Sequence, residues 1–412
     1  MSKLRQAMMA GCLSLSIAFP VAAEEMKAEV IHWWTSGGES AAIKTFADEF
    51  TARGGTWIDQ AIAGGENART QGINRIIGGN PPTAMQLNTG KQFDELVEAD
   101  LLRNLDDIAE AGHWRDNLPK VIADAATRNG SFYAAPINIH GQNWFFYNAE
   151  VFANAGIEPP TTFAELVEDG KALRDAGVIP LALGGQSWQE RLTFNAVLLG
   201  VGGRDTYFKV LRDKDVDTVH GDAFRKVVET YGSMRDLVDE GSPGRNWNDA
   251  TAMVINGKAA VQIMGDWAKG EFIAAGMTPD KEYGCNIISP DEGFIIGGDV
   301  FVFPVVEGDE QNEAQRVLAT LMMEPGPQVA FNEKKGSIPV LLNVDVSGMD
   351  VCAQKAMALL QNSDQQIPSS DFLVSPDIGG ALQDAITQFW NAPEMSVDEF
   401  VDLYSDALQS GF

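Results

Sequence analysis

The sequence predicts an α/β protein of two lobes with a hinge between them, each lobe a mainly parallel sheet flanked by helices. At 412 residues the chain exceeds the size to which one hydrophobic core usually grows. Strand-like and helix-like segments alternate along it, as they do in α/β folds. No long flexible linker divides it, so we expect the chain to cross between the lobes several times, and several crossings make a hinge.

The segment behind the N-terminal leader starts this alternation. Residues 28–34, AEVIHWW, predict a short strand. In 41–50, AAIKTFADEF, the apolar residues Ile43, Phe46 and Phe50 recur at helical spacing, so a helix is expected. Strand and helix therefore follow each other from the start of the mature chain.

The same pattern continues with a second strand at 83–87 and a second helix at 93–102. In open parallel sheets, ligands bind in the crevice at the carboxyl ends of the strands. The loops 34–39 (WTSGGE) and 88–90 (NTG) follow the two predicted strands. We therefore expect both loops at one crevice.

The middle of the chain contains a helix with a defined start. Pro159 and Pro160 end one element, and Thr162 with Glu165 makes a capping box for the next helix. Further segments are predicted as a helix over 246–268, a strand over 297–304, a helix over 312–323 and a loop over 332–340.

The N-terminus predicts a secretory signal peptide over residues 1–23. Lys3 and Arg5 form its basic region, an apolar stretch follows, and VAA before the cut after Ala23 has the small residues of a cleavage site. A lipoprotein is the alternative because Cys12 follows small residues, but almost no apolar run precedes that cysteine. No later stretch reaches the ~20 apolar residues of a spanning helix. We expect a free, soluble protein outside the cytoplasmic membrane.

The composition restricts the partners. A formal net charge of −28 repels phosphate backbones and anionic lipid, so we expect neither nucleic acid nor a membrane surface as a partner. Once the leader is removed, Cys285 and Cys352 are the only cysteines. An oxidising compartment permits them to pair, and the sequence leaves open whether they meet.

No motif of catalysis or cofactor binding stands out. The four histidines are scattered without metal-ligand spacing. There is no nucleophile elbow, phosphate-binding loop or dinucleotide fingerprint. We therefore expect no metal and no cofactor. The many carboxylates leave a pair for glycoside hydrolysis open, but nothing singles out one pair.

Six short stretches occur in one order along the mature chain: HWWTSGGE, GGNPPTAMQL, APINIH, GIEPPTTFAEL, MGDWA and KKGSIP. This set resembles the family 1 extracellular solute-binding proteins, the sugar-binding proteins of ABC importers, and within them the glucose/mannose-binding branch. The resemblance implies the type II periplasmic binding protein fold. It also implies a two-lobe clamp that closes on one sugar and docks on inner-membrane permease subunits.

We expect the N-terminal lobe to comprise residues 24–135 plus 300–345, and the C-terminal lobe 136–299 plus 346–412. The expected function is capture of a monosaccharide, a glucose- or mannose-like hexose or a small glucoside, in the periplasm by a monomer that performs no chemistry. Two rival functions remain: a secreted carbohydrate-active enzyme, which turnover would reveal, and a sensor that signals to a receptor kinase.

The aromatic candidates come from two regions. A sugar ring has an apolar face and a hydroxyl rim, so its site needs indole planes and polar groups. Trp33 and Trp34 match the family's paired tryptophans, and in an extended strand they point to opposite faces, so at most one packs inward. Trp247 and Trp267 match aromatic positions around the sugar, with core packing as the alternative.

Glu39 has two interpretations. With Ser36 as the N-cap, it would complete a capping box, a local role. Gly37 and Gly38 between them are poor helix formers, which favours a segment shaped for close backbone approach to a ligand. We expect Glu39 to bind sugar hydroxyls.

Further polar residues have a cleft role and a structural alternative. Gln86 and Asn88 match family positions that point into the cleft, with turn formation as the alternative. Asn138 and His140 lie in the first crossing, where they would orient hydroxyls or satisfy the hinge backbone. We expect Gln86 and Asn88 to point into the cleft, whereas for Asn138 and His140 the sequence leaves both roles open.

Three charged residues follow later in the chain. Asp266 either binds a hydroxyl or caps the next helix. Asp299 interrupts an apolar strand, where a carboxylate is costly unless it is paired, and it matches a family ligand position. Lys335 aligns with the family's cleft lysine, whose ammonium can donate to the ring oxygen or to hydroxyls.

Two positions depart from the glucose-type pattern. Asn88 stands where the branch commonly has a basic residue, and Asp371 aligns with a position often held by histidine. An aspartate only accepts hydrogen bonds, whereas a protonated histidine donates. Asp371 should therefore meet a hydroxyl that points its proton toward it, which changes the hydrogen-bond pattern at this point of the cleft.

Overall fold

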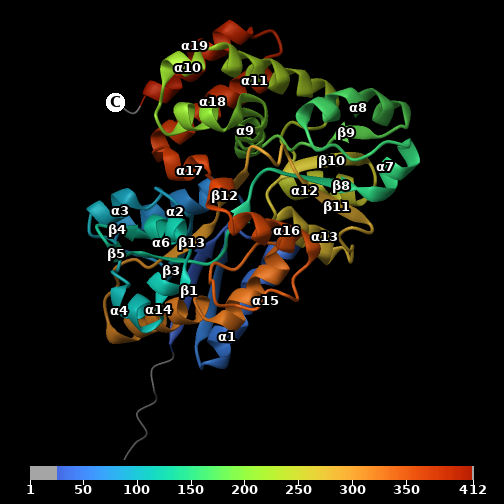
Figure 1. Cartoon of the computed structure of the whole chain (residues 1–412). Helices are drawn as coiled ribbons and strands as arrows, with labels where there is room; N and C mark the ends of the chain where they lie inside the picture. The colour runs from blue at the N-terminus through green and yellow to red at the C-terminus, as the bar shows by residue number, and fades with distance from the viewer. Residues whose placement is uncertain (1–25, 411–412) are drawn as a thin grey trace, which may run out of the picture.

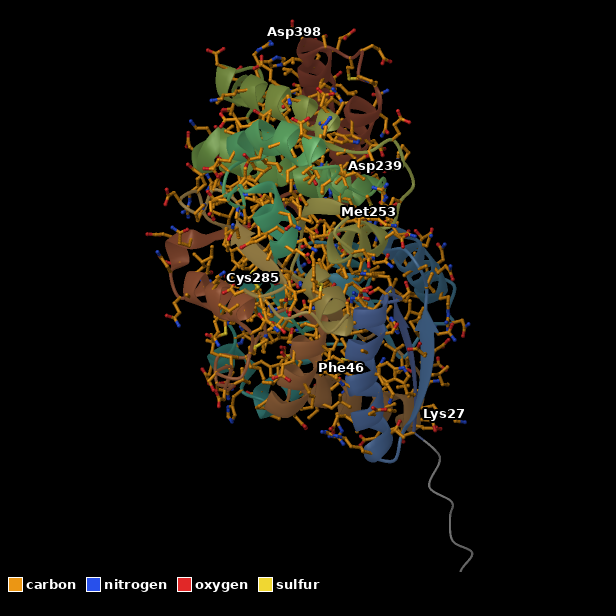
Figure 2. The ribbon with its side chains drawn as sticks, turned by 90° about the vertical axis from the view of Figure 1, so that its right-hand side faces the viewer. Lys27, Phe46, Asp239, Met253, Cys285 and Asp398 are labelled. Carbon is orange, nitrogen blue, oxygen red and sulfur yellow. A yellow bond between two sulfur atoms is a disulfide. The ribbon has the colours of Figure 1, made fainter. Side chains whose placement is uncertain are left out.

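The computed structural model describes residues 26–410, which form two α/β lobes (Figure 1). Figure 2 shows the division from the side, with Lys27 and Phe46 in the lower lobe and Asp239 and Asp398 in the upper one. The two-lobe α/β class predicted from the sequence is confirmed. The predicted signal peptide and the alternative at Cys12 lie outside the described residues.

The first lobe is built on a five-stranded sheet in the order β2-β1-β3-β13-β6. β1 (Lys27–His32) runs parallel to both β2 (Thr56–Ala61) and β3 (Ala84–Asn88). β13 (Asp299–Val302) is antiparallel to β3, and β6 (Ala134–Pro136) is antiparallel to β13. The chain therefore leaves this sheet after β6, builds most of the other lobe, and returns to it with β13.

Helices pack around this sheet, and α1 (Gly37–Ala52) shows why they form. Its buried side chains include Ile43, Phe46 and Phe50, as the spacing predicts. Phe46 stacks on Phe331 of α15 (Pro325–Lys335) with ring centroids 4.7 Å apart. The other elements of this lobe are α2 (Gly65–Ile77), α3 (Asp94–Glu98), α4 (Asp106–Ala111), α5 (Trp114–Asn117), α6 (Lys120–Ala126), β4 (Thr127–Arg128), β5 (Ser131–Phe132), α14 (Asp309–Met322) and α15 (Pro325–Lys335).

The second lobe has a four-stranded sheet in the order β11-β8-β10-β9. Its strands are β8 (Trp144–Asn148), β9 (Ile179–Leu181), β10 (Ala259–Met264) and β11 (Tyr283–Ile287). Its helices are α7 (Ala149–Ala155), α8 (Phe163–Asp175), α9 (Ser187–Leu211), α10 (Val216–Val219), α11 (Asp222–Ser233), η1 (Met234–Leu237), α12 (Trp247–Ile255), α13 (Ala268–Ala274), α16 (Val351–Leu360), η2 (Ser363–Gln365), α17 (Ser370–Leu373), α18 (Pro376–Asn391) and α19 (Val397–Gln409). The predicted capping box of Thr162 and Glu165 is present at the start of α8.

The expectation of mainly parallel sheets is confirmed, with one strand in each sheet running against the others. β13 pairs antiparallel with both of its neighbours, and β8 pairs antiparallel with β10 and β11. The reason is the route of the chain. β1 and β3 end at the crevice between the lobes, whereas β13 arrives from the other lobe, starts at the crevice and runs away from it.

Two local predictions are corrected. In the segment 246–268, predicted as one helix, helix α12 ends at Ile255 and the strand β10 follows. All six residues of β10 are buried, so the run lacks the alternation that marks a strand with one solvated face. In the predicted loop 332–340, the first four residues are the last turn of α15.

The chain crosses between the lobes three times, and the three crossings lie next to one another. A small sheet in the order β14-β12-β7 lies at the junction, formed by β14 (Gln366–Pro368), β12 (Phe294–Gly297) and β7 (His140–Gly141). Ile139 and Ile338, from the first and third crossings, exchange backbone hydrogen bonds of 2.8 and 3.0 Å. Adjacent crossings of this kind permit the lobes to rotate about one region, so this region is the candidate hinge.

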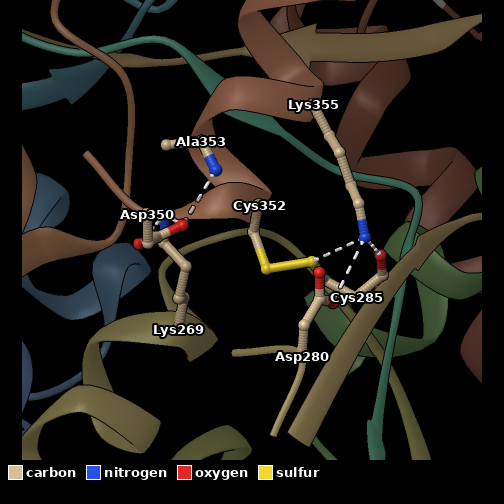
Figure 3. Close-up of a disulfide and its surroundings, with 7 residues drawn as sticks. All are labelled: Lys269, Asp280, Cys285, Asp350, Cys352, Ala353 and Lys355. Atoms are coloured by element: carbon tan, nitrogen blue, oxygen red, sulfur yellow. Dashed lines mark hydrogen bonds and ion pairs between the residues drawn. A yellow bond between two sulfur atoms is a disulfide. The ribbon is translucent and has the colours of Figure 1, made fainter. Parts of the chain in front are cut away.

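A disulfide joins Cys285 of β11 to Cys352 of α16 (Figure 3). Beside it, Lys269 of α13 pairs with Asp350, whose side chain also caps α16 by accepting from the Ala353 N–H at 2.9 Å. The pairing that the sequence left open is therefore present. It holds α16 on the second lobe.

The lobe boundaries proposed from the sequence remain a prediction. β6 of the first sheet ends at Pro136, one residue after the proposed boundary at 135. β13 begins at Asp299, one residue before the proposed boundary at 300. Among residues 26–410, no helix is long and apolar enough to cross a membrane.

Candidate functional site

A cavity of about 390 Å³ lies between the lobes, within the usual size range of small-molecule sites. Residues of the loop from Trp33 to Glu39, which follows β1, line it, and so do Asn88, the last residue of β3, and Lys91 in the loop after it. The second lobe contributes residues of α9, α12, α17 and α18. The expectation that the loops after the first two predicted strands share one crevice is confirmed.

Most of the predicted site residues are gathered at this cavity. Those that line it are Trp33, Trp34, Glu39, Asn88, His140, Trp247, Trp267, Asp299, Lys335 and Asp371. In the described part of the chain, Gln86, Asn138 and Asp266 do not line it and instead hold the residues that do. Contact of any of these side chains with a ligand remains a prediction.

The paired tryptophans point to opposite sides, as their alternation in an extended segment requires. Trp34 is 1% exposed and packs against Phe301 and Phe331, with ring centroids 5.8 and 5.2 Å away. Trp33 is half-buried and lies over Gly65 at the start of α2. Trp34 therefore lines the cavity while being almost fully buried, and Trp33 has the more accessible indole.

The second lobe adds three tryptophans. Trp188 and Trp267 lie at a tilt of 56° with centroids 6.1 Å apart, and the Trp267 and His140 rings are nearly perpendicular with centroids 4.9 Å apart. Trp247, the first residue of α12, is half-buried at the same cavity. Partly exposed indoles therefore come from both lobes.

Asp299 lines the cavity and is the centre of a buried hydrogen-bond network. The Asp299 carboxylate accepts from the side-chain amides of Gln86 at 3.0 Å and Asn138 at 2.8 Å. Gln86 also accepts from the Trp33 backbone N–H at 3.0 Å, and Asn138 accepts from the Asp299 backbone N–H at 2.6 Å. Gln86 and Asn138 thus fix the carboxylate and the loop that carries Trp33.

His140 lies between two carboxylates. Its Nε2 is 3.0 Å from Asp299 and its Nδ1 is 2.5 Å from Asp266. Carboxylates only accept hydrogen bonds, so an imidazolium that donates from both nitrogens satisfies both contacts. Asp266 also accepts from the Gly141 backbone N–H at 2.9 Å. Trp267 is the N-cap of α13, so the helix-capping alternative for Asp266 is wrong.

The network raises the pKa of His140 and lowers the pKa of Asp299. Burial, the largest effect, would lower the pKa of His140, but the charges and hydrogen bonds of Asp266 and Asp299 outweigh it and raise that pKa. Burial would likewise raise the pKa of Asp299, but His140 and then Lys335 outweigh it and lower that pKa. Both shifts favour the ion pair over its neutral form.

Glu39 and Lys335 form a second buried ion pair. The Lys335 ammonium is 2.9 Å from Glu39 and lies 5.6 and 5.9 Å from the ring centroids of Trp34 and Trp267. The Ser36 hydroxyl accepts from the Glu39 backbone N–H at 3.4 Å, so Ser36 caps α1 as the local interpretation requires. The Glu39 side chain, however, points to Lys335 and the cavity.

Asp371 has partners that the sequence did not reveal. One of its oxygens is 3.3 Å from the Arg191 guanidinium and the other accepts from the Asn88 amide at 3.2 Å. Arg191 also donates to the Ser370 hydroxyl at 3.4 Å. A basic residue is therefore present at this end of the cavity after all, contributed by α9 instead of position 88.

Sequence reasoning missed the contribution of α9. Trp188, Arg191 and Asn195 line the cavity from one face of this helix, at intervals of three and four residues. Their spacing in SWQERLTFN was a usable signal, because an aromatic, a cationic and an amide side chain share one helical face.

Three comparisons bear on identity. The model of the bacterial extracellular solute-binding protein family matches residues 34–319. A "Probable sugar-binding periplasmic protein" of Mesorhizobium japonicum is 35% identical over 98% of this chain and 94% of its own length. A protein of the same name from Brucella melitensis is 34% identical over 96% and 95%.

Among solved structures, a chitin oligosaccharide binding protein superimposes with a TM-score of 0.78 at 18% identity, over 93% of this chain and 98% of its own. That likeness supports the fold. The family match covers more than half of the chain, and the relatives cover nearly all of it. The chain is therefore a binding protein and not an enzyme: it belongs to the family of bacterial extracellular solute-binding proteins.

Proposed function

We propose that this protein binds a sugar between its two lobes in the periplasm and delivers it to an ABC-type membrane permease. The names of the relatives support a sugar ligand and a periplasmic location. A further relative from Pyrococcus horikoshii, 31% identical over 83% of this chain, is named an ABC transporter extracellular-binding protein. The predicted signal peptide is consistent with export.

One observation carries the proposal: indole faces and buried ionic hydrogen-bonding groups line the same interlobe cavity. Trp33, Trp188, Trp247 and Trp267 offer apolar planes, while Asp299 and Lys335 offer an acceptor and a donor. A sugar ring needs both kinds of surface, because its C–H faces are apolar and its rim is polar. Hydrogen bonds to charged groups contribute about 1.5–3 kcal/mol each.

We further propose that the ligand is a monosaccharide, a hexose of the glucose or mannose type, bound by a monomer. Specificity would depend on Asn88 and Asp371, the two departures from the branch pattern. Arg191 and Asn88 hold the Asp371 carboxylate, whose remaining lone pairs can accept a sugar hydroxyl. A sugar without a hydroxyl at this point would leave that acceptor desolvated, so its affinity should be at least tenfold lower.

A panel of sugars tests the function. Thermal unfolding of the mature protein with glucose, mannose, galactose and their deoxy forms should show a shift for at least one sugar, since ligand at 100 times its Kd adds about 2.7 kcal/mol. Calorimetry then ranks the sugars for the wild type and for Asp371→His, which should move the preference toward glucose. If glucose already binds best and the variant keeps the ranking, Asp371 lies outside the sugar contacts.

A further inference from the structure

Three glycines bring backbones of both lobes into direct contact beside the cavity. A Cβ on Gly38 of α1 would lie 2.7 Å from the carbonyl carbon of Gly270 in α13. A Cβ on Gly270 would lie 2.9 Å from the Lys334 oxygen, and one on Gly336 would lie 2.5 Å from the Asp266 oxygen. Real Cβ contacts are essentially never under 3.0 Å. We call Gly38, Gly270 and Gly336 the glycine contact.

The glycine contact lies between the lobes. α1 and α15 pack together in the first lobe. α13 is fixed to the second sheet, because Phe272 packs on Phe146 of β8 and Tyr283 of β11 with centroids 5.9 and 4.4 Å away. Gly336 ends α15 two residues before Ile338, which pairs with Ile139 in the hinge. A small separation here therefore has to be taken up by rotation of one lobe against the other.

A carboxylate of the second lobe completes this contact. The backbone N–H of Gly38 donates to the Glu271 side chain of α13 at 2.9 Å, across 233 residues of sequence. The first N–H groups of a helix have no acceptor within the helix, and its N-terminus attracts negative charge. Glu271 therefore caps α1 from the opposite lobe. The close approach that Gly38 permits is to the Gly270 backbone and not to a ligand, which corrects the interpretation from sequence.

We propose that the glycine contact and Glu271 set how closely the lobes approach, and thereby determine sugar affinity without touching the sugar. The inference rests on the proposed sugar-binding function. Gly38 and Glu271 are not among the described residues that line the cavity, whereas Glu39, next to Gly38, is. A side chain at Gly38 would keep the lobes apart and lower the population of the closed state. The apparent affinity for sugar falls in proportion to that population.

Two adjacent glycines give a matched test. A Cβ on Gly37 would meet the Glu271 side chain at 3.8 Å, an ordinary contact, whereas one on Gly38 meets backbone. Gly37→Ala and Gly38→Ala change the first turn of α1 equally in helix propensity. By calorimetry with glucose, mannose and galactose, we expect Gly38→Ala to bind at least tenfold more weakly than the wild type, and Gly37→Ala within about twofold of it.

Glu271 gives an independent pair of variants should Gly38→Ala fail to fold. Glu271→Ala removes the acceptor for the Gly38 N–H and should weaken binding several-fold. Glu271→Gln keeps an oxygen that can accept this hydrogen bond, so it should restore most of the affinity. Equal affinities for Glu271→Ala and the wild type would contradict the proposed role of Glu271.

A distance measurement separates lobe closure from mere damage to the fold. Gln383 of α18 donates to Glu66 of α2 at 2.8 Å across the rim, so spin labels at the exposed positions Thr70 of α2 and Asp384 of α18 report the opening. With sugar, the label distance should stay longer in Gly38→Ala than in Gly37→Ala. Without sugar, Gly38→Ala should lack the short-distance population of Gly37→Ala.

The outcomes distinguish the inference from the proposed function. If a sugar binds the wild type but both glycine variants bind and close alike, the inference is overturned while the function stands. If no sugar of the panel binds the wild type, the proposed function is contradicted. In that case the sugar-free label distances still decide the inference, and identical distributions for the two glycine variants overturn it.

Discussion

The adjacent tryptophans provide a sharp test of how the cavity is built. Trp34→Ala should lower the free energy of unfolding by about 3–5 kcal/mol, the usual cost of removing a buried large aromatic side chain. The indole is 1% exposed and packs against Phe301 and Phe331, so its removal leaves a cavity in the first-lobe core.

Trp33→Ala is the matched variant, because its indole is half-buried at the cavity. Full burial of a large apolar side chain contributes ~1.5–3 kcal/mol, so half of it predicts a loss of about 1 kcal/mol in unfolding free energy. The main loss should appear in sugar affinity. Trp34 therefore has a core role that the sequence alone did not assign to it.

Urea unfolding followed by circular dichroism measures the stability of both variants, and calorimetry with the bound sugar measures affinity per folded molecule. The expected result is a large stability loss for Trp34→Ala and a large affinity loss for Trp33→Ala. A Trp34→Ala protein as stable as Trp33→Ala but unable to bind sugar would refute this assignment, since it would make Trp34 the ligand-facing indole.

Three further predictions follow from buried groups. Lys335→Met leaves the Glu39 carboxylate buried without its cation, so urea unfolding should show that the unfolding free energy falls by about 3–5 kcal/mol. Lys334→Met changes an exposed neighbour, so its unfolding free energy should stay within about 0.5 kcal/mol of the wild type. The pKa of His140 is raised in the folded state, so His140 contributes its full stabilisation below pH 6.5, its ordinary pKa, and loses it as the pH rises through the pKa of the folded protein. Urea titrations from pH 5 to 9 should show this decline in the wild type and not in His140→Asn. Reduction of the disulfide, which spans 67 residues, should lower the unfolding free energy by about 4 kcal/mol in the loop-entropy estimate, and an unchanged denaturation midpoint under reductant would contradict the bridge.

Much of the local structure was predictable because its causes lie within a few residues of sequence. The helical spacing of Ile43, Phe46 and Phe50 located α1, and the reciprocal bonds of Thr162 and Glu165 fixed the start of α8. These signals depend on contacts between residues three or four positions apart. By the same reasoning, the buried run of β10 was mistaken for helix, since a strand buried on both faces has no alternation to detect.

The crevice and most of its lining were also predictable. Loops that follow strands meet at one edge of a sheet, which placed Trp33, Glu39 and Asn88 at the same cavity. The order of short motifs supported Asp299 and Lys335 through resemblance to a family. The contribution of α9 was missed, because Arg191 reaches Asp371 across 180 residues and neither residue is unusual in its own segment.

The sequence by itself thus determined the α/β class, the two lobes, the local caps and the set of loops at the crevice. Only the tertiary structure decided which tryptophan of the pair is core, that Gln86 and Asn138 hold Asp299, and what Gly38 approaches. The physical reason is sequence distance. A capping box joins residues three apart, whereas the Gly38 N–H finds its acceptor, Glu271, 233 residues away on the other lobe. No local pattern encodes such a contact, because it exists only once both lobes have folded and met.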